Sequence, residues 1–312
     1  QIAKVLEREK LRAYRIEDLD RILADVKTDV KMQVVRNDEG SPSSGSSAVA
    51  AMVGLGLGMV LYMFLMIYGA MVMQSVIEEK SSRVLEVVVS SVRPFELMMG
   101  KIFGVASVAV VQVLIWAVLV CGAGAAVMPH VLPDGAMEAA AALQQGGGAA
   151  TAAAGDFDPE TLGAIALATD VGYLAMLFGY LLLFVVGGYL LYSAMFAAVG
   201  SAVDNAQDAA QLQTPIMIPI ILAVIVEMSV LNDPNSPLAF WFSLIPFTSP
   251  VVMMARIPYG IPTWEIVLSL VLLYAAFVGM VWLSAKIYRV GIFMYGKKPT
   301  LREMFRWIRY KY

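Results

Sequence analysis

Five long apolar segments constrain this chain more than any other feature of its sequence. They cover residues 48–77, 102–128, 171–199, 214–231 and 264–285. Each is close to, or longer than, the roughly 20 residues of helix that cross the hydrocarbon core of a bilayer. Lipid offers no partner to an unpaired backbone amide, so we expect five membrane-spanning helices. With 59% hydrophobic and 15% charged residues, the composition also indicates an all-α integral membrane protein, a polytopic helix bundle.

The positions of Lys and Arg predict how these spans are oriented. Basic residues gather in the cytoplasmic segments of membrane proteins. Four of them follow the first span and eight follow the last, whereas no Lys or Arg lies between Lys101 and Arg256. We therefore expect a connecting helix, a loop and a tail on the cytoplasmic side, at residues 78–94, 200–213 and 286–312. Five spans then place residues 1–47 outside, and a cytoplasmic N-terminus requires a sixth span upstream of this fragment.

The predicted segments outside the spans differ in kind. Residues 1–47 read as the end of an extracytoplasmic domain followed by a flexible tether. Residues 129–170 are rich in Ala, Gly and Gln, which favours a mobile loop with a short helix over a binding domain. In the tail, Thr300 and Glu303 form a capping box that begins an amphipathic helix, which we expect to lie on the anionic lipids of the inner leaflet.

Residues 232–263 precede the last span and contain Pro246 and Pro250, which would break a continuous spanning helix. A pair of short re-entrant helices in the outer leaflet fits best, acting either as an aromatic interfacial loop or as a cap over a substrate path. Glu227 is the ionisable candidate within the spans. Its position near the end of the fourth span favours a carboxylate that reaches outer water over an ion ligand. Glu227, Pro246 and Pro250 are thus the candidate substrate-path residues.

Residues for catalysis or for a resident cofactor are scarce. Cys121 is the one cysteine and His130 the one histidine, which argues against thiol or histidine metal sites. The stretch GIFMYGKK nearly matches a phosphate-binding loop, but Lys298 stands where a magnesium-binding hydroxyl belongs, and the stretch follows a membrane helix instead of a strand. We therefore expect neither an enzyme nor a nucleic-acid partner, and no cofactor on this chain.

A charged cluster after the first span, EEKSSRVLE, holds five charged residues in nine positions. If residues 78–91 are helical, Glu79 and Arg83 form a favourable i,i+4 pair and Glu86 continues the row. Membrane anchoring alone would favour an excess of Lys and Arg, because an anionic leaflet repels acids. Mixed charges on one face instead favour a protein partner that docks from the cytoplasm.

The order of a long span, EEKSSRVLEVVVSSVRPFELMMGK and a second span resembles the permease subunits of ABC exporters, specifically the sodium-extrusion (NatB-like) branch of the type V exporter fold. Two further stretches support the resemblance, GSAVDNAQDAAQLQTP and IPFTSPVVMMARIPYGIPTW. It implies six spans per subunit, a second permease copy or close paralogue, and a separate cytoplasmic ATPase that binds ATP and Mg²⁺. The implied ATPase-coupling residues are Glu78, Glu79, Arg83 and Glu86, with Asp204, Asn205, Asp208 and Gln211 as secondary contacts.

The expected function is therefore that of a transmembrane subunit in a bacterial cytoplasmic (inner) membrane, which moves substrate outward by alternating access while a separate ATPase hydrolyses ATP. Two alternatives stay open. One is a mechanotransmitting permease that acts on an outer partner, and the other is a secondary transporter or channel that needs no ATP. The substrate is open as well, among sodium, lipids, drugs and peptides.

Overall fold

The computed structural model describes residues 47–82, 92–132, 135–144, 159–294 and 300–307. The chain divides into two units, Gln1–Gly40 and Ser41–Tyr312, and the described residues all belong to the second. The predictions for the outer segment 1–46, for Arg83 and Glu86, and for Lys298 therefore concern residues outside this description. Throughout the described ranges the regular elements are helices, and no strand is present.

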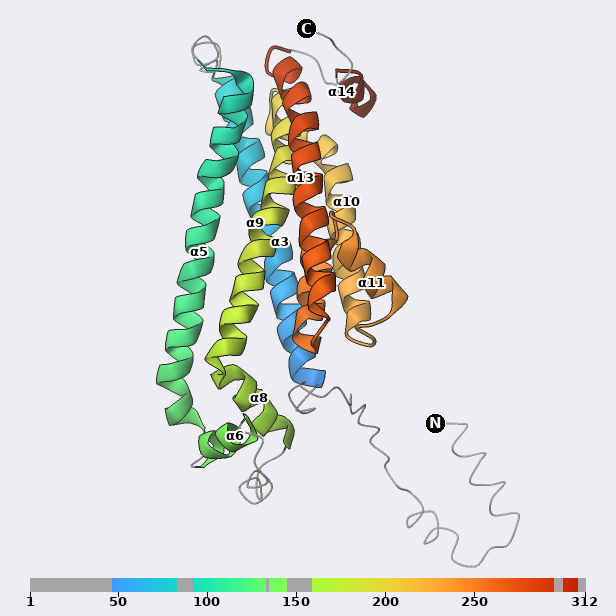
Figure 1. The fold of residues 1–312 in the computed structure, drawn as a ribbon. Coiled ribbons are helices and arrows are strands. Elements are labelled where there is room, and N and C mark those ends of the chain that lie inside the picture. Colours follow the sequence, from blue (N-terminus) through green and yellow to red (C-terminus); the bar gives the residue numbers. More distant parts are fainter. Residues whose placement is uncertain (1–46, 83–91, 133–134, 145–158, 295–299, 308–312) are drawn as a thin grey trace, which may run out of the picture. The chain divides into compact units, whose positions relative to one another are not determined.

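Five long helices within the described ranges confirm the predicted polytopic bundle. Each is long and apolar enough to cross a membrane. They are α3 (Ser47–Ser81), α5 (Pro94–Val131), α9 (Val171–Ala202), α10 (Ala206–Val230) and α13 (Thr263–Gly291). Figure 1 shows them packed lengthwise, and α9 contacts each of the other four.

One end of the bundle collects the ends of α3, α9 and α13 and the starts of α5 and α10 (Figure 1). We call it the basic end, because Lys80, Arg93, Lys101 and Arg289 lie there. Several helices run past the predicted spans at this end, and α10 begins eight residues before residue 214. The added turns, AQDAAQLQ, are rich in good helix formers. The Asn205 side chain accepts a hydrogen bond from the Asp208 N–H at 2.9 Å and so caps the helix.

Short helices fill the connections at the opposite end. α6 (Ala136–Gln144) and α8 (Pro159–Thr169) pack together through Ala136, Ala140 and Ile165, within the segment predicted to be a loop with one short helix. α11 (Pro237–Leu244) and α12 (Ser249–Arg256) are the two short helices predicted before the last span, and η1 (Ile257–Tyr259) follows them. Near the C-terminus, α14 (Leu301–Trp307) begins at the predicted capping box, where Glu303 accepts a hydrogen bond from the Thr300 N–H at 2.9 Å.

Glycines on α3 allow its close packing within the chain. A Cβ added at Gly54 would overlap the Ala255 carbonyl oxygen of α12, and one added at Gly58 would overlap the Glu227 carboxyl group of α10. The GxxxG pattern left open whether this face packs within the subunit or across a dimer. In the structure it packs within the chain, against α12 and α10.

Candidate functional site

Lys80, in the last turn of α3, joins the ends of three helices at the basic end. Its ammonium group donates hydrogen bonds to the carbonyl oxygens of Ser201, at 2.8 Å, and Gly291, at 2.9 Å. It also forms an ion pair with Asp204 at 3.0 Å, and the Lys80 side chain is fully buried. Ser201 and Gly291 lie in the last turns of α9 and α13, where carbonyl groups lack intrahelical partners and carry partial negative charge. These four residues form the Lys80 cluster.

A second lysine connects α5 to the same end of α3. The Lys101 ammonium lies 2.7 Å from the Glu79 carboxylate and donates to the Ser75 carbonyl at 2.9 Å. Together with the Lys80 cluster, this contact ties the basic ends of α3, α5, α9 and α13 to one another.

Those predicted coupling residues that the structure describes, from the two turns predicted to be cytoplasmic, lie at this end. Glu78 is exposed in the last turn of α3, and Glu79 beside it binds Lys101. In the second turn, Asp204 binds Lys80 and Asn205 caps α10. Asp208 receives a further hydrogen bond from the Asn205 side-chain amide at 2.9 Å, and Gln211 is exposed on the next turn of α10. Glu79 and Asp204, both expected to face a partner, thus also bind within the chain.

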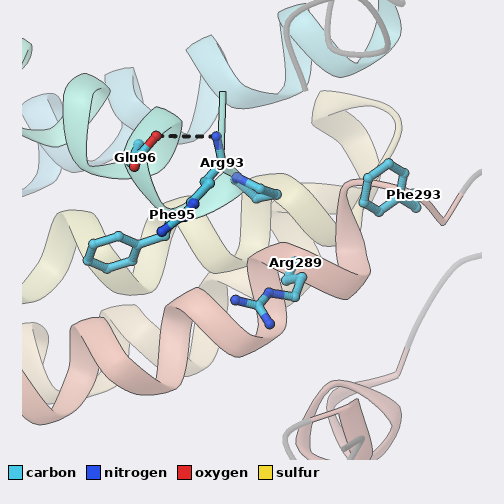
Figure 2. A pocket seen from close by; sticks show the side chains of 6 residues that line it. Arg93, Phe95, Glu96, Arg289 and Phe293 are labelled. Atoms are coloured by element: carbon cyan, nitrogen blue, oxygen red, sulfur yellow. Dashed lines mark hydrogen bonds between the residues drawn. The ribbon is translucent and has the colours of Figure 1, made fainter. Parts of the chain in front are cut away.

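A pocket of about 480 Å³ opens between the start of α5 and the end of α13. Figure 2 shows Arg93, Phe95 and Glu96 on one side of it and Arg289 and Phe293 on the other. The Glu96 carboxylate accepts a hydrogen bond from the backbone N–H of Arg93 at 3.3 Å. Within the described ranges, no carboxylate forms an ion pair with either guanidinium group. Two arginines that form no ion pair with a described carboxylate suit an anionic group such as a carboxylate or phosphate.

At the opposite end, a buried arginine connects the short helices to α13. The Arg256 guanidinium forms an ion pair with Glu265 at 2.9 Å and donates to the Pro234 carbonyl at 2.8 Å and the Ser243 hydroxyl at 2.6 Å. Burial lowers the pKa of Arg256, and the neighbouring Glu265 carboxylate opposes that effect. These four residues form the Arg256 cluster, which fixes α11 and α12 against the start of α13.

The sequence reasoning missed both buried cations as structural centres. Lys80 belongs to the basic residues that predict topology and to the charged cluster EEKSSRVLE, but neither pattern indicates that it binds the ends of two distant helices. Arg256 carried a clearer signal, because it is the one Lys or Arg between Lys101 and Lys286 and lies in an apolar stretch. A buried charge needs a partner, and Glu265 follows nine positions later.

The candidate substrate-path residues do not form one site: Glu227 packs against α3 and Pro250 packs against α9. Glu227 is fully buried against Gly58 of α3, so the expectation that its carboxylate reaches outer water is wrong; the side chain points between helices instead of out of the bundle. Pro250 is buried against Gly188 of α9, while Pro246 lies two residues after the end of α11 and follows its C-cap residue Ile245. Among the described residues, no group of three or more His, Cys, Asp or Glu is placed to hold a metal ion.

Comparison with known proteins gives the family. Residues 5–286 match the model of the ABC-2 family transporter proteins. The chain is 27% identical over 246 residues to the uncharacterized protein YhaP of Bacillus subtilis, which covers 78% of the chain and 52% of that protein. It is also 27% identical over 260 residues to the uncharacterized protein MJ1024 of Methanocaldococcus jannaschii, covering 83% of the chain and 54% of that protein.

The chain thus spans about half the length of these curated relatives. No solved structure matches it. The family match extends from the N-terminal segment into α13, and so includes α3, α5, α9 and α10, most of α13, and every residue of the two clusters of buried polar contacts except Gly291. The chain belongs to the ABC-2 family of transporter membrane proteins.

Proposed function

We propose that this chain is the permease part of an ABC exporter, of the sodium-extrusion (NatB-like) branch with the type V fold. It moves substrate outward by alternating access, driven by a separate ATPase that carries ATP and Mg²⁺. The basic end faces the cytoplasm of a bacterial cell, and a second permease copy completes the translocation unit. The permease family and the charge distribution support this assignment.

The observation that carries the proposal is the Lys80 cluster. The predicted docking stretch continues directly from the last turn of α3, where Lys80 binds the ends of α9 and α13. Force applied to this stretch would therefore reach three spans together, and the Lys101–Glu79 pair adds α5. Rigid, connected elements of this kind carry energetic coupling between distant sites.

The second predicted cytoplasmic turn, between α9 and α10, contacts the same Lys80 cluster. Asp204 is bonded to Lys80, and the residues that follow it are exposed at the start of α10. An ATPase that touches both turns would engage α3 and α10 at once. The pocket between Arg93 and Arg289 extends this surface, because Arg93 follows the docking stretch closely in sequence. We assign it to an acidic side chain of the ATPase.

The test is reconstitution of the full-length permease with a candidate ABC ATPase, sought first among the proteins encoded beside it. We expect the two to purify together and to carry ATP-dependent efflux in proteoliposomes. Arg83→Glu or Glu86→Lys should reduce efflux and the stimulation of ATP hydrolysis while the spans remain folded. Gln74→Glu, an exposed change on α3 before the charged cluster, serves as the control.

Each contrary result has a distinct meaning. Flux by the permease alone would instead indicate a secondary transporter or channel. Stimulated ATP hydrolysis without any flux would favour a mechanotransmitting permease. Unchanged co-purification and stimulation in both charge-reversal variants would overturn the assigned docking surface.

A further inference from the structure

Glu227 presents a buried carboxyl group that neither the Lys80 cluster nor the Arg256 cluster uses. It lies in the last turn of α10, at the opposite end from the proposed ATPase surface, and its side chain is fully buried. Neither carboxyl oxygen has a hydrogen-bond partner among the described residues. Its neighbour is Gly58 of α3, where even a methyl group would overlap the carboxyl. We propose that Glu227 is a proton-binding site between α3 and α10, protonated while these helices are in contact and ionised when they separate.

The charges around Glu227 support a neutral carboxyl group. On α10 the other charged residue is Asp208, in the first turn of the helix. On α3 the charged residues are Glu78, Glu79 and Lys80, some twenty positions beyond Gly58. α9 and α11 contain no Asp, Glu, Lys, Arg or His.

The remaining cation on the packed elements is Arg256 of α12, one residue after the Ala255 that touches Gly54. Its guanidinium is already bonded to Glu265, Ser243 and Pro234. Tyr62 of α3 and Tyr259 of η1 are the nearest titratable tyrosines by sequence to this contact, and tyrosine ordinarily ionises only near pH ~10. A lone carboxylate is far costlier to bury than the protonated acid, which favours the neutral form here.

A proton suits this place better than a metal ion. Calcium, for example, takes about six to eight oxygen ligands, whereas the neighbour Gly58 has no side chain, and no group of three or more His, Cys, Asp or Glu among the described residues is placed to hold a metal ion. One proton removes the charge without any further ligand. Sodium is the main competing occupant, and the test below separates it from the proton.

The contact is also placed where α10 can move. Pro215 and Pro219 lie inside α10, and each lacks the backbone N–H that would bond to the preceding turn. The segment that carries Glu227 follows these interruptions. When it moves away from α3, water reaches the carboxyl group and the proton can leave. Protonation would thus favour the closed contact, and ionisation would favour the separated one.

The test uses the full-length protein in lipid nanodiscs without ATPase, so its outcome is independent of the proposed exporter function. Infrared spectroscopy reports a protonated carboxyl through its C=O stretching band. We expect such a band at neutral pH in sodium-free buffer, lost in Glu227→Gln and kept in Glu138→Gln, which changes an exposed acid on α6. Adding sodium should leave the band unchanged.

Three results would overturn the proposal. They are absence of the band in the wild type at neutral pH, persistence of the band in Glu227→Gln, and loss of the wild-type band when sodium is added. The last result would assign the site to sodium. Because the wild-type spectra alone decide the first and third points, the test does not depend on the variant folding. Gly58→Ala is a second variant. Its added methyl group should displace the Glu227 carboxyl group into contact with water, so the C=O band should disappear at a lower pH than in the wild type.

Discussion

At the residue scale, single buried cations organise the two ends of this bundle. Lys80 binds carbonyl oxygens from residues 121 and 211 positions away in the chain, and Arg256 joins the loop before α11 to α13. Both cations satisfy groups that would otherwise be buried without a partner. A buried ion pair or hydrogen bond matters to stability chiefly because removing one partner leaves the other buried and unpaired, which costs free energy.

Lys80→Met tests this cost with a side chain of similar length. We expect the free energy of unfolding to fall by about 3 kcal/mol, at the lower end for a broken buried pair because Asp204 is partly exposed. Lys101→Met is the matched comparison and should cost about 1 kcal/mol, since its partner Glu79 is more exposed. Unfolding in mixed detergent micelles measures both. Equal losses in the two variants would contradict the central role of Lys80.

At the element scale, the sequence predicts the helices well because their signals are local. Length, apolar content and the proline positions lie within each segment, so the five spans and the two short helices before the last span follow directly. The capping of α14 by Glu303 is local too. The sequence carries no local signal for which helices pack together, because contacts such as those of Lys80 with its carbonyl acceptors join residues that are far apart in sequence. For the same reason the GxxxG pattern predicts a close contact without naming α10 and α12.

The glycines of α3 provide a matched pair of substitutions. Gly54 faces the Ala255 carbonyl, whereas Gly56 has no neighbour within 4 Å of an added Cβ. We expect Gly54→Ala to destabilise the protein by about 1–3 kcal/mol, because the backbone of α12 must move. Gly56→Ala should be neutral, or stabilising by up to ~1 kcal/mol through helix propensity. Thermal unfolding of the two variants in the same detergent measures both changes in stability. A similar loss for both would mean that the α3–α12 contact is loose.

At the scale of the whole molecule, chemistry is divided between the two ends of the bundle. The basic end joins four spans through lysines and has two exposed arginines at a pocket, and the opposite end holds the Arg256 cluster and the buried Glu227. The placement of Lys and Arg in the sequence predicts that basic residues gather at the first of these ends. The sequence predicts the opposite end poorly, since the burial of Glu227 depends on Gly58, a glycine in a distant helix.

The pocket between α5 and α13 gives the last prediction. If an acidic side chain of the ATPase enters it, Arg93→Glu combined with Arg289→Glu should weaken ATPase binding about tenfold or more, through like-charge repulsion at the contact. Both arginines are exposed, so the spans should keep their stability. Arg302→Glu combined with Arg306→Glu, on α14, is the control of equal charge change. Binding is measured by titrating labelled ATPase onto permease nanodiscs made of neutral lipid. Equal weakening by both double variants would indicate general electrostatic attraction, and unchanged binding in the first would remove the pocket from the docking surface.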